Sequence, residues 1–242
     1  MNRTPAPVDL GRRAVAELVG TGFLVAAVIG SGIAAARLSP TDVGLQLLEN
    51  SLATGAVLVA LILALQPVSA AFNPVVTLIE RGFGLVTTPT AAVLIAAQVV
   101  GGVTGAVVAN LMFDLDPVTI STHDRTGGNL LFAEIVATVG LVVVIFGSMR
   151  TGRTNTIAFA VGGYITAAYW FTASTSFANP AVTIARMFSD TFAGISPSSV
   201  PWFVLAQLGG GALAAVVVRY LYPYATTAAV LTGAGNDTQE TQ

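Results

Sequence analysis

The sequence contains no cysteine, no lysine and only one histidine among its 242 residues. The missing cysteines exclude disulfides, thiolate metal sites and cysteine nucleophiles. Charged residues make up 9% of the chain, whereas about a quarter is usual in a soluble domain, and 54% of the residues are hydrophobic. The formal net charge is −2 and the ten arginines are scattered, so we expect no nucleic-acid partner. This composition is typical of a protein embedded in a lipid bilayer.

Residue groups that would support enzyme chemistry are also missing. The sequence has no histidine cluster, no Ser-His-Asp set and no glycine-rich phosphate loop. The single histidine, His123, falls in a polar loop with three aspartates. We therefore expect no enzyme activity, no cofactor and no metal site.

The chain does have long apolar runs, each about 18 to 25 residues in length, which is enough to cross a bilayer as a helix. They predict membrane-spanning helices at residues 12–36, 45–66, 89–112, 128–149, 155–173 and 199–221. The predicted fold class is an all-α membrane protein with one domain, residues 12–222, after a short N-terminal segment, 1–11. The polar tail, 223–242, is expected to be disordered. The first run resembles a signal peptide, but it is long enough to span and contains a glutamate.

The two halves of the chain repeat one pattern. Residues 16–30 and 133–147 agree at seven of fifteen positions, including Glu17 with Glu134, and residues 97–113 match 206–222, including Gln98 with Gln207. Repeat one covers about 12–113 and repeat two about 128–222, with three spans each. An odd number of spans makes the second repeat enter from the opposite face, so the repeats are predicted to be inverted.

The arginines predict an orientation in the membrane. Seven of them (Arg3, Arg12, Arg13, Arg81, Arg150, Arg153 and Arg219) fall on the side of the termini, and three (Arg37, Arg125 and Arg186) fall on the other. Because cytoplasmic loops carry the excess of positive charge, both termini are expected in the cytoplasm.

An Asn-Pro pair follows the second apolar run of each half. Asn is a strong N-cap and Pro is favoured at the first helical position, so Asn73-Pro74 and Asn179-Pro180 predict helix starts. From Asn73 to Gly82 a helix would be only about 15 Å long, which is half of a bilayer. The pattern therefore predicts two half-helices on re-entrant loops that enter from opposite faces and meet near the middle of the membrane.

Two half-helix N-termini that point at each other would repel cations and pass neutral solutes. Glu17 and Glu134, with Gln98 and Gln207, are interpreted as supports for the N–H groups of the two loops, because an intramembrane carboxyl needs an interior partner. A proton-relay pair in a coupled transporter is the alternative for these glutamates. The glycines of residues 100–105 and 209–211 are interpreted as helix-packing surfaces. For Phe72, Phe177, Tyr169 and Trp170, packing or an interface belt is favoured over a place in the pore.

Six spans, inverted halves, a glutamate in spans 1 and 4 and paired Asn-Pro motifs together resemble the aquaporin and aquaglyceroporin family. The first motif is Asn73-Pro74-Val75, and the second is Asn179-Pro180-Ala181. The resemblance covers residues 12–222. It implies one pore per subunit, a homotetramer, and a place in a bacterial inner membrane.

One departure from the family pattern bears on selectivity. Family members usually have an arginine directly after the second motif, where this sequence has Val182, and Arg186 follows four residues later in the expected outer vestibule. Matched by count, the remaining filter positions are Thr54 (or Ala53), Ala167 within one residue, and Ser176 (or Thr175). All of these are small or aliphatic.

The absence of both the filter arginine and a bulky filter residue predicts a wide, uncharged opening. The expected function is a passive channel for neutral solutes such as polyols, metalloid acids and water. Val182 followed by "TIAR" resembles the branch linked to bacterial arsenic resistance, which implies conduction of arsenite. A coupled secondary transporter with inverted repeats and a plain water channel are the alternatives.

Overall fold

The computed structural model describes residues 8–223 of the chain. The expected segment 1–11 and tail 223–242 therefore lie mostly outside the described residues. Within 8–223 the secondary structure is entirely helical. The elements in chain order are α1 (Leu10–Leu38), α2 (Val43–Leu65), α3 (Pro74–Gly82), α4 (Thr88–Met112), α5 (Gly128–Arg150), the 3₁₀ turn η1 (Thr154–Thr156), α6 (Ile157–Phe171), α7 (Pro180–Arg186) and α8 (Val200–Leu221).

Five of these helices, α1, α2, α4, α5 and α8, are long and apolar enough to cross a membrane. Their bounds lie within two residues of five of the six predicted spans. The sixth predicted span, 155–173, corresponds to α6, which also begins and ends within two residues of the prediction but has only 15 residues, or about 22 Å. The chain leaves helical geometry at Thr172, whose backbone is extended, and continues toward the second half-helix.

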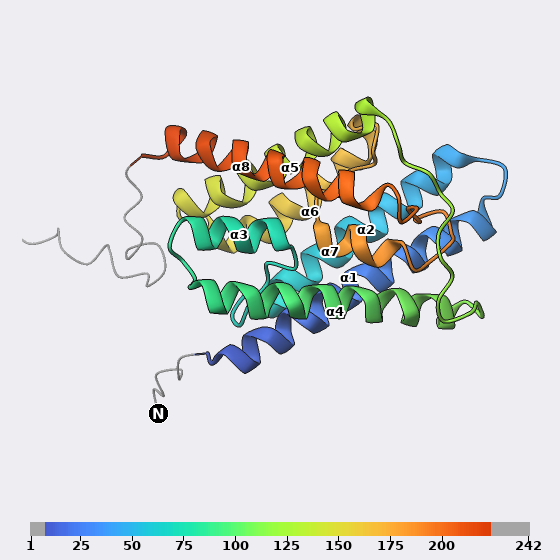
Figure 1. Ribbon diagram of the computed structural model, residues 1–242, viewed down its shortest axis with the longest axis horizontal. Coiled ribbons are helices and arrows are strands. Elements are labelled where there is room, and N and C mark those ends of the chain that lie inside the picture. The colour runs from blue at the N-terminus through green and yellow to red at the C-terminus, as the bar shows by residue number, and fades with distance from the viewer. Residues whose placement is uncertain (1–7, 224–242) are drawn as a thin grey trace, which may run out of the picture.

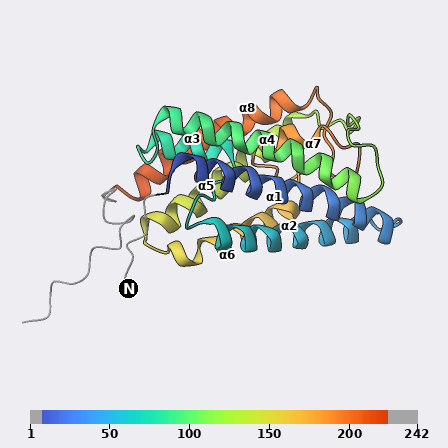
Figure 2. The ribbon, with the colours of Figure 1, turned by 90° about the horizontal axis from the view of Figure 1, so that it is seen from below.

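The helices run lengthwise in one elongated bundle (Figures 1 and 2), with α1 packed against α4, α5 against α8, and α2 against α6. α1 starts at the end of the bundle where the described chain begins and finishes, which we name the terminal face. α5, its equivalent in the second repeat, starts at the opposite end, the distal face. The predicted all-α fold with inverted halves is confirmed by this arrangement.

The loop between the repeats lies at the distal face. Residues 113–127 cross it in an extended path, pairing by backbone hydrogen bonds with the segment after α7: Thr119 and Ser121 donate to Phe188 and Met187, and Ser196 donates to His123. This loop therefore packs, together with the segment that follows α7, around the C-terminal end of α7.

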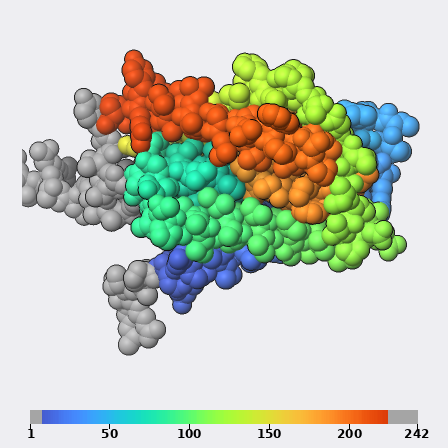
Figure 3. Space-filling view, viewed as in Figure 1, coloured from blue at the N-terminus to red at the C-terminus, as the bar shows by residue number. Residues whose placement is uncertain are grey.

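The two half-helices, α3 and α7, lie end to end inside the bundle and point in opposite directions (Figure 1). α3 contacts α4, α8 and α7, and the space-filling view shows it between α4 and α8 on one side of the molecule (Figure 3). Each has its proline at the start, directly after an asparagine N-cap. The re-entrant half-helices predicted from the Asn-Pro pairs are part of the confirmed fold.

Glycines allow α1 and α4 to approach closely. A Cβ atom added at Gly101 would lie 2.1 Å from the carbonyl oxygen of Leu18, and one added at Gly105 would lie 2.2 Å from that of Gly22. Real Cβ atoms essentially never come this near to a backbone oxygen. The glycines of α4 thus act as a packing surface between transmembrane helices.

Candidate functional site

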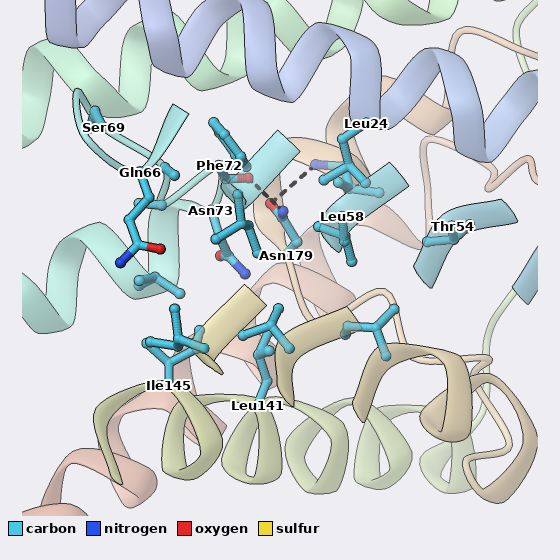
Figure 4. A pocket seen from close by; sticks show the side chains of 18 of the residues that line it. Leu24, Thr54, Leu58, Gln66, Ser69, Phe72, Asn73, Leu141, Ile145 and Asn179 are labelled. Atoms are coloured by element: carbon cyan, nitrogen blue, oxygen red, sulfur yellow. Dashed lines mark hydrogen bonds between the residues drawn. The ribbon is translucent and has the colours of Figure 1, made fainter. Parts of the chain in front are cut away.

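A cavity of about 380 Å³ runs along the interior of the bundle. Toward the terminal face its lining includes Arg13, Gln66, Glu80, Met149 and Thr154, and toward the distal face it includes Thr54, Tyr169, Ser176, Val182 and Arg186. Between these ends apolar side chains of α1, α2, α5 and α6 face the two re-entrant loops. Figure 4 shows Gln66 and Ser69 at one end of this space and Thr54 at the other.

The two asparagines meet at the middle of the cavity (Figure 4). Asn73 Nδ2 donates to the carbonyl oxygen of Ala178 at 2.8 Å, and Asn179 Nδ2 donates to that of Phe72 at 2.7 Å. Each asparagine is thereby bound to the loop of the other repeat. An amide nitrogen carries two hydrogens, so one hydrogen of each asparagine remains for a molecule in the cavity.

Local backbone geometry turns these carbonyls toward the partner loop. Phe72 and Ala178, directly before the asparagines, have φ values of 49° and 47°, in the left-handed region that non-glycine residues seldom adopt. Each asparagine also caps its own half-helix, since Asn73 Oδ1 accepts from Val75 N and Asn179 Oδ1 accepts from Ala181 N, both at 3.0 Å. Strained backbone kept in place by cross-links is common at functional sites.

Glu17 of α1 holds the first re-entrant loop. It is fully buried, and its two carboxyl oxygens accept from Ser69 Oγ at 2.6 Å, Ala71 N at 2.9 Å and Phe72 N at 2.7 Å. Gln98 Nε2 donates to the same carboxyl at 2.8 Å and to Thr77 Oγ1 of α3 at 2.9 Å. A single polar cluster therefore joins α1, α4, the loop and the half-helix.

The second repeat builds the same cluster. Glu134 of α5 accepts from Phe177 N and Ala178 N, both at 2.9 Å. Gln207 Nε2 donates to Glu134 at 2.6 Å and to Thr183 Oγ1 of α7 at 2.8 Å. The two glutamates and two glutamines singled out from the sequence thus lie where the loops need acceptors and donors.

Three of the four residues matched to filter positions, Thr54, Ser176 and Val182, line the cavity. Ala167 does not: its side chain is exposed on the outside of α6. The lining of α6 follows a four-residue spacing, Ile157, Val161, Ile165 and Tyr169, and Ala167 falls on the opposite face of that helix. Counting back from Asn179 gave the wrong residue because the intervening loop is folded back, with Thr175 and Ser176 at positive φ.

At the distal end of the cavity, the lining residue that α6 contributes is Tyr169. Its hydroxyl lies 3.1 Å from Thr54 Oγ1. Phe72 and Phe177 line the cavity as well, and all three aromatics also belong to buried hydrophobic clusters, so the expected packing role is confirmed and a place in the cavity wall is added to it. Trp170 is half exposed and donates from Nε1 to Ser51 Oγ at 3.1 Å. The four-residue spacing along α6 is a signal in the sequence that could have identified Tyr169.

Arg186, at the end of α7, is buried and lines the cavity. Its Nε donates to the carbonyl oxygen of Ala193, and its guanidinium carbon lies 3.5 Å from the ring centre of Phe177. Arg125 of the distal loop lies over the same ring at 4.9 Å and donates to Gly194 O, and burial lowers the pKa of Arg125 to about 10. The expectation of an uncharged opening lined only by small or aliphatic side chains was therefore wrong.

Among residues 8–223, no cluster of His, Cys, Asp or Glu has the arrangement needed to hold a metal ion. What the described residues do form is a helical bundle around a cavity that passes the meeting point of two half-helices. That combination defines a transmembrane channel.

The chain belongs to the major intrinsic protein family, whose model matches residues 6–156 and 148–241. It is 50% identical over 214 residues to the aquaglyceroporin AqpS of Rhizobium meliloti (strain 1021), covering 88% of this chain and 91% of that protein. The family makes this protein a channel for water or glycerol, and not an enzyme.

Two more distant proteins are also similar to this chain. The probable aquaporin TIP2-2 of Oryza sativa subsp. japonica is 29% identical over 218 residues, with 86% of each chain covered. The X-ray structure of the aquaglyceroporin from Plasmodium falciparum superposes with a TM-score of 0.69 at 15% identity, covering 89% of this chain and 98% of that one. At that identity the likeness concerns the fold alone.

Proposed function

We propose that the protein conducts neutral solutes of polyol size, including glycerol and arsenite as its neutral acid, passively alongside water. The observation that carries this proposal is Val182, which lines the cavity at the position where the family usually has an arginine. A valine leaves more room next to the asparagine pair and removes a charge from that level. Glycerol and neutral arsenite each present three hydroxyl groups, which suit the free amide hydrogens of Asn73 and Asn179.

The proposal also includes the oligomeric state, the membrane location, the topology and the role of the two glutamates that we expect from the sequence. The protein would form homotetramers in a bacterial inner membrane, with one pore per subunit, as the family resemblance implies. The termini would lie in the cytoplasm, since arginines are concentrated near the terminal face. Glu17 and Glu134 would be structural, because backbone and side-chain donors of the loops occupy both carboxyl groups.

Stopped-flow light scattering of proteoliposomes tests the proposal by comparing water efflux with uptake of glycerol and of arsenite, beside protein-free vesicles. We expect fast uptake of both solutes, unchanged when Na⁺ and H⁺ gradients are collapsed. Loss of uptake on collapse would indicate a coupled transporter, and fast water without solute uptake would indicate a plain water channel.

Val182→Arg tests the role of the filter valine. We expect it to lower glycerol and arsenite flux by about tenfold or more and water flux by much less, since it narrows and charges the passage. Val182→Leu is the matched control, because it adds volume without charge. Unchanged solute flux in Val182→Arg would contradict the proposal.

A further inference from the structure

The end of the cavity toward the terminal face contains a carboxyl group that the repeat of the sequence does not account for. Glu80 follows Asn73 by seven residues, and the residue seven places after Asn179 in the second repeat is Arg186. On α3, Asn73, Val76 and Glu80 all line the cavity, so their spacing places them on one face of the half-helix. At 1.5 Å per residue, Glu80 lies about 10 Å from Asn73 along the axis of α3.

The carboxyl oxygens of Glu80 are not used by the fold. The two other carboxyl groups inside the bundle belong to Glu17 and Glu134, and both accept hydrogen bonds from the re-entrant loops. Within residues 8–223, the side chain of Glu80 accepts no hydrogen bond and forms no ion pair. It is only partly buried and lines the cavity, so its oxygens remain as acceptors for a molecule inside the cavity.

Arg13 of α1 supplies hydrogen-bond donors at the same end of the cavity. It lines the cavity as Glu80 does, and its positive charge acts on the carboxyl group of Glu80. In the part of the chain that the structure describes, the two side chains nevertheless form no ion pair, so they are separated by more than the distance of a direct contact. Their opposite charges offset each other, and the pair offers both an acceptor and donors to a neutral molecule.

An anchored amide completes this end of the cavity. Gln66, directly after α2, donates from Nε2 to the carbonyl oxygen of Thr154 at 3.2 Å, and both residues line the cavity. Figure 4 shows Gln66 at this end, away from Thr54. We name the group Arg13, Gln66, Glu80 and Thr154 the terminal mouth. Between Glu80 and Asn73 the cavity face of α3 offers only the apolar side chain of Val76, so the terminal mouth is separate from the asparagine pair.

We propose that Glu80 and Arg13 form a binding site for the hydroxyl groups of neutral solutes at the terminal mouth. A hydroxyl group donates and accepts hydrogen bonds, so one molecule with several hydroxyls can donate to Glu80 and accept from Arg13. Hydrogen bonds with charged partners are stronger than those between neutral groups. A polyol such as glycerol, or a neutral acid with three hydroxyls, would therefore be held between the two side chains before it enters or after it leaves the apolar part of the passage.

The inference deepens the proposed function and rests on it, and Glu80→Met tests it because methionine keeps the side-chain length and removes both acceptor oxygens. In proteoliposomes we expect glycerol permeability at low concentration to fall about fivefold or more and the half-saturating glycerol concentration to rise, with water flux within about twofold of the unmodified protein. Glu80→Gln keeps one acceptor oxygen and should retain an intermediate glycerol flux. Arg81→Gln is the matched control, because Arg81 is the next residue of α3 but is exposed and lies outside the cavity lining.

Two further variants separate binding from size and from structure. Glu80→Ala widens the passage while it removes the acceptors, so it should lower glycerol flux if Glu80 binds the solute and raise it if Glu80 only limits size. Arg13→Met should lower glycerol flux, and combining it with Glu80→Met should add little, because either change already breaks the bridge. If Glu80→Met does not reach the membrane, Glu80→Gln and Glu80→Ala provide the same comparison.

Three results would overturn the inference while leaving the proposed function in place, provided that the unmodified protein conducts glycerol. They are unchanged glycerol flux in the variants of Glu80, an equal fall of water and glycerol flux, and a rise of glycerol flux in Glu80→Ala. Absence of glycerol flux in the unmodified protein would instead overturn the proposed function.

Discussion

Glu17 fixes the first re-entrant loop, and Glu17→Gln removes one of its two acceptor oxygens while keeping its size. On one oxygen the donors are Ser69 Oγ and Ala71 N, and on the other they are Phe72 N and Gln98 Nε2. The Ser69 hydroxyl can rotate and the Gln98 amide can turn, but the backbone cannot. Whichever way the new amide points, one buried backbone N–H loses its acceptor.

The loss of stability can be worked out from the number of hydrogen bonds that Glu17→Gln disrupts. An orphaned buried donor costs about 1 to 3 kcal/mol, and the second, rearranged hydrogen bond contributes about 1 kcal/mol more. We therefore expect a loss of about 2 to 4 kcal/mol in the free energy of unfolding. The left-handed backbone at Phe72 would no longer be held, so glycerol flux should fall as well.

Thermal melting of the purified protein in detergent, followed by size-exclusion chromatography of heated samples, measures this loss. Glu49→Gln is the control, because Glu49 accepts one bond from Ser39 Oγ through Oε1 and its Oε2 has no partner among the described residues. An amide at Glu49 can keep that single bond. If Glu17→Gln melts at the same temperature as Glu49→Gln and conducts normally, the supporting role of Glu17 is refuted.

Two further predictions concern packing and pH. Gly105→Leu should prevent accumulation of folded protein in the membrane, because even a Cβ there would lie 2.2 Å from a backbone oxygen of α1, and overpacking costs about 1 to 3 kcal/mol or more. The control Gly209→Leu places its side chain in open space and should accumulate normally. Equal yields of the two variants on a fluorescence size-exclusion profile would contradict the packing argument. Partial desolvation, followed by the nearby guanidinium groups, lowers the pKa of His123 below 6.5. The unfolded chain then binds a proton at His123 before the folded protein does, so stability should fall as the pH drops through 6.5 toward the folded pKa, and His123→Gln should show a flatter melting profile between about pH 7.5 and pH 5. A profile that keeps its slope in the variant would assign the pH dependence to other groups.

The sequence predicted the fold well because its signals are local or repeated. An Asn-Pro pair specifies a helix start by capping chemistry alone, and the match of Glu17 with Glu134 shows that one solution is used twice. Apolar run length gave all six spans to within two residues. These features do not depend on knowing which distant residues come together.

The end of the cavity toward the distal face could not be predicted in the same way. The position of Tyr169 depends on the path of residues 172–179, where Thr175, Ser176 and Ala178 adopt positive φ, and counting residues along such a segment gives no direction. The direction of Arg186 depends on the ring of Phe177 and on a carbonyl seven residues later. These are tertiary contacts, and counting residues from a motif along the sequence carries no information about them.

The crossed hydrogen bonds between Asn73 and Ala178 and between Asn179 and Phe72 also bear on how the chain is made. The partners of the first bond are 105 residues apart, so the first loop emerges from the ribosome long before its acceptor exists. Until the second half is inserted, an amide and a carbonyl at membrane depth lack partners, a state that is costly in hydrocarbon. The two repeats, although alike in sequence, therefore complete folding as one cooperative unit, and neither half is a finished membrane protein by itself.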